Sequence, residues 1–83
     1  MRDRLAAADA IAPLSDRQRE VLAALGHGAS NHDIARQLHL TEGTVKQYVS
    51  GLMRDLGVTN RVRAALLAYQ AGLTDIAHDN RDI

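Results

Sequence analysis

Apolar residues recur at helical spacing along most of this chain, and no stretch alternates apolar and polar residues as a strand would. The pattern predicts an all-α protein with four helices, each preceded by a capping residue and followed by a break. The helices are expected over about 16–26, 31–38, 42–56 and 61–71. The expected caps are Ser15, Ser30, Thr41 and either Thr59 or Asn60, and the expected breaks contain Gly26–Gly28, His39, Gly57 and Gly72.

The stretch 42–56 carries the clearest periodicity. Its apolar residues fall at intervals typical of one buried helix face, and they are Val45, Val49, Leu52 and Leu56. The shorter stretch 31–38 has its own apolar stripe, Ile34, Ala35 and Leu38. His39 lies in the turn between them, where we expect a positive φ, because histidine tolerates that region better than most residues.

The two ends of the chain are less regular. Leu5, Ala8 and Ile11 are spaced as in a helix, so residues 1–13 form either a short extra N-terminal helix or a linker that ends at Pro13. Residues 74–83 read as a loose acidic tail, with Asp75, Asp79 and Asp82 against Arg81. The chain is therefore divided into residues 1–13, a domain over 14–73 and the tail.

Length and composition limit what this domain can be. Eighty-three residues hold one small domain, and with no Cys, Trp or Phe its core must consist of Leu, Ile, Val and Ala. The absence of Cys excludes disulfides and Cys-containing zinc fingers. No apolar run is long enough to span a membrane and no signal peptide opens the chain, so we expect a cytoplasmic protein.

Charge gives a weaker indication. Ten Lys and Arg balance ten Asp and Glu over the whole chain. Residues 15–73 carry seven cationic and five acidic side chains, a small basic excess. Such a centre permits binding to a nucleic acid without being diagnostic of it.

The polar side of the stretch 42–56 is more informative. Lys46, Gln47, Ser50 and Arg54 share one continuous face, opposite the apolar one. These side-chain types pair with base edges and phosphates of DNA. Gly43 and Gly51 each cost a helix about 1 kcal/mol relative to Ala, and they leave room for another surface to approach. A short helix, a three-residue turn and a longer helix form the layout of a helix-turn-helix.

Four segments resemble the LuxR/NarL-type (GerE-like) DNA-binding domain of bacterial transcription regulators. They are LSDRQREVL at 14–22, GASNHDIA at 28–35, LTEGTVKQYV at 40–49 and LGVTNR at 56–61. Their order and spacing match throughout residues 14–73. The resemblance implies a four-helix domain whose third helix reads the major groove, whose second helix braces it and whose fourth helix commonly forms a two-fold dimer contact.

Carried over by position, the resemblance assigns three groups of residues. Base contacts fall on Lys46, Gln47 and Ser50. Phosphate contacts fall on Asn31, Thr41, Thr44, Tyr48 and Arg54. The dimer contact falls on Ala64, Leu67, Ala68 and Ala71. The implied partners are double-stranded DNA, a second copy of the chain and, through transcription, RNA polymerase, and the C-terminal effector domain of a response regulator is the implied context.

Other interpretations stay open. The fourth helix is apolar nearly all round, so it could pack under the N-terminal segment, or the chain could be a helical protein-interaction module that never contacts DNA. An enzyme is disfavoured, since no nucleophile, phosphate-loop or paired-carboxylate motif is present. The four histidines lack metal-ligand spacing, so we expect no metal, cofactor or small-molecule ligand. The chain could be a fragment of a longer regulator or a single-domain one.

Overall fold

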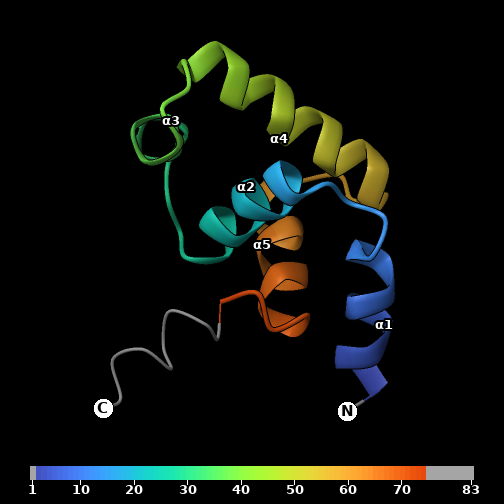
Figure 1. Ribbon diagram of the computed structural model, residues 1–83. Coiled ribbons are helices and arrows are strands. Elements are labelled where there is room, and N and C mark those ends of the chain that lie inside the picture. Colours follow the sequence, from blue (N-terminus) through green and yellow to red (C-terminus); the bar gives the residue numbers. More distant parts are fainter. Residues whose placement is uncertain (1, 75–83) are drawn as a thin grey trace, which may run out of the picture.

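The computed structural model describes residues 2–74 and consists there of five helices without a strand. They are α1 (Arg2–Ile11), α2 (Asp16–Gly26), α3 (Asn31–Leu38), α4 (Glu42–Leu56) and α5 (Arg61–Gln70). The expected all-α helix-turn-helix fold is confirmed, and the N-terminal segment takes the helical alternative (Figure 1). Most of the acidic tail lies outside the described residues.

The capping residues explain where the helices begin. Ser15 and Ser30 each close a capping box at the start of α2 and α3, with Gln18 and Asp33 as the reciprocal partners. Thr41 caps α4 through the backbone N–H of Thr44. Of the two candidates at α5, Asn60 is the cap, because its side chain accepts from the Arg63 backbone N–H at 2.9 Å.

Residues with positive φ explain two of the helix ends. His39 has φ 58°, as expected from its place in the turn, and Gly57 has φ 70° after α4. The left-handed conformation at His39 lets the Leu40 N–H donate back to the Ala35 carbonyl at 2.9 Å. The chain thereby leaves α3 and enters α4 within three residues.

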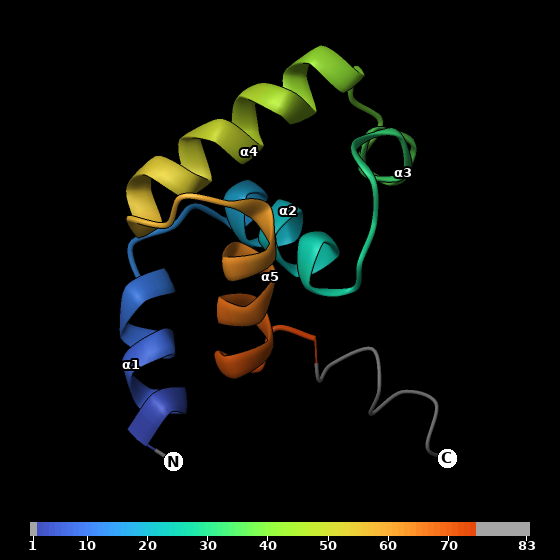
Figure 2. The same cartoon turned by 180° about the vertical axis from the view of Figure 1, so that it is seen from behind.

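The helices enclose one aliphatic core. In Figures 1 and 2, α4 lies across one end of the molecule, with α3 at its N-terminus and α2 and α5 below it. The largest fully buried side chains come from α2, α3 and α4, and they are Val21, Leu22, Ile34, Val45 and Leu52. Among the described residues no polar or charged side chain is buried, so hydrophobic burial is the main stabilising contribution.

Helix α1 packs beside α5 in both views (Figures 1 and 2). Ala7 and Ile11 are buried, whereas Leu5 and Ala8 of the predicted stripe are exposed. The Arg19 guanidinium of α2 donates to the carbonyls of Ile11 and Ala12 at 3.5 and 2.8 Å, which satisfies acceptors at the end of α1. None of the helices in residues 2–74 combines the length and apolar character that crossing a bilayer requires.

Candidate nucleic-acid interface

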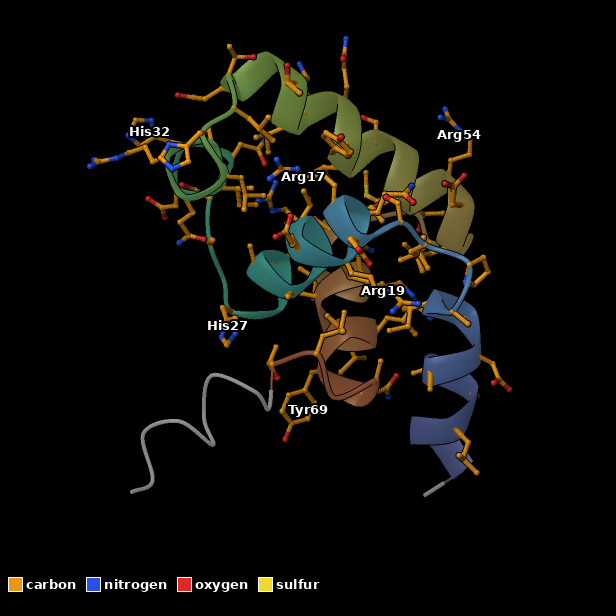
Figure 3. All side chains as sticks on the ribbon, viewed as in Figure 1. Arg17, Arg19, His27, His32, Arg54 and Tyr69 are labelled. Atoms are coloured by element: carbon orange, nitrogen blue, oxygen red, sulfur yellow. The ribbon has the colours of Figure 1, made fainter. Side chains whose placement is uncertain are left out.

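Helix α4 owes its orientation to its apolar seam. Val45 and Leu52 are fully buried and Val49 is 5% exposed, while Leu56 at the end of the seam is half-buried. Helical geometry then turns the opposite side of α4 to solvent. Lys46, Gln47, Ser50 and Arg54 are all exposed, as the sequence predicts. Arg54 projects away from the body of the molecule in Figure 3.

The two glycines of α4 lie on its accessible side without a packing reason. A Cβ at Gly43 would meet only Thr41 Oγ1 at 3.9 Å, and one at Gly51 only Arg54 Nη2 at 3.7 Å. Both distances are ordinary contacts, so the fold itself tolerates alanine at either position. Because glycine has no side chain, another molecule can approach the backbone of α4 closely at these two positions.

Three of the predicted phosphate-contacting residues flank this face. Thr41 is exposed, and its hydroxyl donates to the Thr44 hydroxyl at 2.9 Å. Thr44 is half-buried, and Tyr48 is half-buried with part of its ring against the core. All three belong to α4 or its cap, so the structure brings them together with the predicted base-contacting residues.

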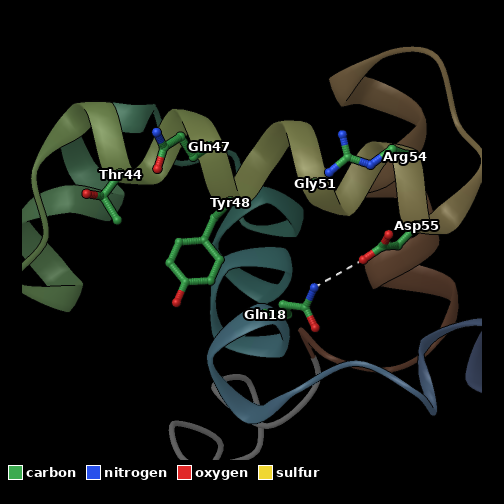
Figure 4. Close-up of a pocket in the computed structure, with 7 residues that line it drawn as sticks. All are labelled: Gln18, Thr44, Gln47, Tyr48, Gly51, Arg54 and Asp55. Atoms are coloured by element: carbon green, nitrogen blue, oxygen red, sulfur yellow. Dashed lines mark hydrogen bonds between the residues drawn. The ribbon is translucent and has the colours of Figure 1, made fainter.

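A hollow of about 450 Å³ lies between α4 and the start of α2. Its lining consists of Gln18, Thr44, Gln47, Tyr48, Gly51, Arg54 and Asp55 (Figure 4). The side chain of Gln18 crosses from α2 and donates through Nε2 to Asp55 Oδ2 at 3.3 Å. Sequence reasoning gave Gln18 only a capping role, because a contact between residues 37 apart leaves no periodic signal.

Asn31 differs from the other predicted phosphate contacts because it already has a partner. The Arg61 guanidinium at the start of α5 donates to Asn31 Oδ1 at 2.7 Å and to the Ala29 carbonyl at 2.9 Å. A guanidinium only donates, so the Asn31 amide must present its oxygen to Arg61 and its NH2 group elsewhere. Arg61 therefore ties α5 to the N-terminus of α3, a role that the sequence did not reveal.

A second polar contact joins α3 to α4. His32 Nδ1 lies 2.9 Å from Glu42 Oε2, and both side chains are exposed. The hydrogen bond and charge of Glu42 raise the pKa of His32. Hydrogen bonds from the Ser30 backbone and hydroxyl lower the pKa of Asp33 in the same helix. Within residues 2–74 no group of three or more His, Asp or Glu side chains could hold a metal ion.

The predicted dimer stripe on α5 requires a correction. Ala64 and Ala68 are fully buried inside one copy of the chain, so they are not available to a second copy. Their position follows from the close packing of α5 on α2, where a Cβ at Gly26 would lie only 2.9 Å from the Ala68 Cβ. Leu67 and Ala71 are half-buried against the core.

The exposed apolar side of α5 is a different one. Val62, Leu66 and Tyr69 are 76%, 53% and 66% exposed and follow one another at i, i+4 and i+7. They share a helix face directed away from Ala64 and Ala68. Helix α1 packs on α5, a possibility that the sequence left open, and this packing does not cover Val62, Leu66 and Tyr69. We call the face formed by these three residues the α5 stripe.

The chain is similar to bacterial regulators over most of its length. Residues 12–68 match the family of GerE, described as bacterial regulatory proteins of the luxR family. The transcriptional regulatory protein LnrK of Bacillus subtilis is 44% identical over 61 residues, which are 74% of this chain and 28% of LnrK. The DNA-binding transcriptional activator DevR/DosR of Mycobacterium tuberculosis is 40% identical over 62 residues, 75% of this chain and 29% of that protein.

A response regulator shows the same degree of similarity. RamR of Streptomyces coelicolor is 40% identical over 62 residues, which are 75% of this chain and 31% of RamR. The chain thus spans less than a third of the length of these three relatives. The match runs from residue 12 to residue 68, so it includes α2 to α4 and all but the last two residues of α5, and it leaves out the α1 helix.

Proposed function

Because this chain belongs to the luxR family of bacterial regulatory proteins, we propose that it binds specific sequences in double-stranded DNA through α4 in the major groove, as part of transcription regulation. The observation that carries the proposal is the exposed face of Lys46, Gln47, Ser50 and Arg54 on a helix whose other side is buried. A helix about 10–12 Å across fits a major groove about 12 Å wide.

The chemistry of this face separates two tasks. We assign contacts with base edges to Lys46, Gln47 and Ser50, which would discriminate sequences, each good bidentate pair contributing about 1–3 kcal/mol. We assign contacts with phosphates to Arg54, Thr44, Tyr48 and Thr41, which would fix the register and supply salt-dependent affinity. The Asn31 amide, held by Arg61, adds an NH2 donor at the start of α3.

The decisive experiment measures binding to a random-sequence duplex of about 20 base pairs as a function of salt. DNA binding predicts a log–log slope near −0.9 for each phosphate contact. Lys46→Ala and Arg54→Ala should each weaken binding and leave the thermal unfolding midpoint unchanged, because both side chains are exposed. Arg63→Ala is the matched control: it removes an exposed cation from α5, outside the α4 face.

Selection of bound sequences from a random pool then gives the preferred site. If Lys46→Ala and Arg54→Ala bind DNA as well as the unmodified protein does, α4 is not the recognition helix. A protein that binds no duplex at any salt concentration would instead favour the alternative function, a helical protein-interaction module.

We further propose that two copies pair through the α5 stripe and bind two related half-sites about one helical turn apart. Three large apolar side chains exposed along one helix face are unusual for a surface with no partner. Leu66→Arg should shift the protein to a monomer in sedimentation and weaken binding to the selected site. Leu5→Arg on α1 is the control, since it adds the same charge at another exposed leucine, 61% exposed against 53% for Leu66.

A further inference from the structure

The hollow beside α4 contains one acidic side chain among several hydrogen-bond donors. Arg54, Tyr48, Thr44 and Gln47 can all donate to a phosphate, and Asp55 cannot while it is ionised. Asp55 is exposed, and no described Lys, Arg or His side chain forms an ion pair with it. A carboxylate at this point repels a phosphate that comes close to it.

The position of this carboxylate is fixed by Gln18. The Gln18 Oε1 accepts from the Ser15 backbone N–H at 2.8 Å, which completes the capping box of α2. Because a backbone N–H can only donate, the NH2 group of Gln18 must face the other way, toward Asp55 Oδ2 at 3.3 Å. The cap of α2 thereby holds the amide donor that orients Asp55 over the hollow (Figure 4).

We propose that Asp55 is a specificity-determining residue that disfavours non-specific binding to DNA, and that Gln18 positions it. This inference rests on the proposed function. Non-specific binding relies on phosphate contacts in many registers, some of which bring a phosphate close to the Asp55 carboxylate. Specific binding holds α4 in a single register set by Lys46, Gln47 and Ser50, in which phosphates contact Arg54, Thr44 and Tyr48 on the other side of the hollow and not the Asp55 carboxylate.

Two substitutions should act in opposite directions. Asp55→Asn keeps the size of the side chain and removes the charge, so affinity for a random-sequence duplex should rise by up to about fivefold, the effect of one unit charge at about 4 Å in water. Gln18→Glu keeps an acceptor for the capping box and adds a second carboxylate to the hollow, so the same affinity should fall by up to about fivefold.

The comparison needs a control for net charge. Asp9→Asn on α1 removes another exposed carboxylate, one that lies away from the hollow. Binding of each variant is measured by fluorescence anisotropy against the random duplex and against the sequence selected by the unmodified protein, at about 0.05 and 0.2 M salt. The affinity for the selected sequence divided by the affinity for the random duplex should fall in Asp55→Asn and in no other variant. The thermal unfolding midpoint of Asp55→Asn should stay close to that of Asp9→Asn.

The outcomes separate this inference from the proposed function. If the unmodified protein binds the random duplex with a salt-dependent affinity, but Asp55→Asn and Asp9→Asn raise that affinity equally, the role of Asp55 is wrong and DNA binding stands. A Gln18→Glu variant that binds the random duplex more tightly than the unmodified protein does also contradicts the role of Asp55. If the unmodified protein binds neither duplex, the proposed function fails, and the inference fails with it.

Discussion

The same substitution, Gly→Ala, should have opposite effects on stability at two positions of this fold. At Gly26, the last residue of α2, a Cβ would lie 2.7 Å from Thr74 Cγ2 and 2.9 Å from the Ala68 Cβ. Ala68 is fully buried where α5 packs on α2, so it cannot move without displacing α5. Overpacking of this kind costs about 1–3 kcal/mol.

At Gly51 the same methyl group meets no obstacle. Its nearest neighbour would be Arg54 Nη2 at 3.7 Å, the end of a flexible and exposed side chain. Ala replaces Gly in the interior of α4, where helix propensity favours it by about 1 kcal/mol. Gly51→Ala should therefore stabilise the protein by up to about 1 kcal/mol, whereas Gly26→Ala should destabilise it.

Thermal unfolding followed by circular dichroism distinguishes the two variants. A domain of this size shifts its midpoint by about 4–8 °C per kcal/mol, so Gly51→Ala should melt several degrees higher and Gly26→Ala several degrees lower than the unmodified protein. If Gly26→Ala melts at or above the midpoint of Gly51→Ala, α2 and α5 do not approach each other as closely as the structure describes. Weaker DNA binding by the stabilised Gly51→Ala variant would support close approach of DNA to α4.

Three further predictions concern polar contacts between helices. Arg61→Met should lower the free energy of unfolding by about 1–3 kcal/mol in urea denaturation, and adding Asn31→Ala should lower it little further, because the two substitutions remove the same hydrogen bond. The pKa of His32 is raised, so the stabilisation from its contact with Glu42 should be complete below about pH 6.5 and be lost as the pH rises through the raised value. His32→Gln should accordingly lower the unfolding midpoint more at about pH 5.5 than at about pH 8.5, and an equal loss at both would contradict the assignment. Arg19→Met should accelerate hydrogen exchange in α1 and leave α4 protected, because the carbonyls of Ile11 and Ala12 lose their donor.

The helix-turn-helix could be predicted from the sequence because its signals are local. Ser30 and Thr41 cap α3 and α4 at the expected residues, and His39 adopts the expected positive φ. The seam of α4 predicts its outward face directly, since residues on one helix share a fixed angular relation. The caps, the turn and the periodicity of α4 depend on residues that lie within about four positions of each other in the sequence.

The faces of α5 could not be predicted in the same way. A helix rich in Ala and Leu on every side has no distinct polar face, so periodicity does not say which side packs inside. The close approach of α2 at Gly26 determines which side of α5 packs inside, because only a small side chain such as that of Ala68 fits there. Similarly, α1 buries Ala7 and Ile11 and leaves Leu5 exposed, since the surface of α5 determines which side of α1 it contacts.

The contacts that hold α4 differ in strength, and the difference bears on how this surface works. Burial of Val45, Val49 and Leu52 contributes about 1.5–3 kcal/mol for each side chain, so the seam fixes the position of the helix. The contacts of Gln18 with Asp55 and of His32 with Glu42 are exposed, and water competes for them. Changes at these polar contacts should therefore alter DNA binding while the fold persists, whereas changes in the seam should remove both together.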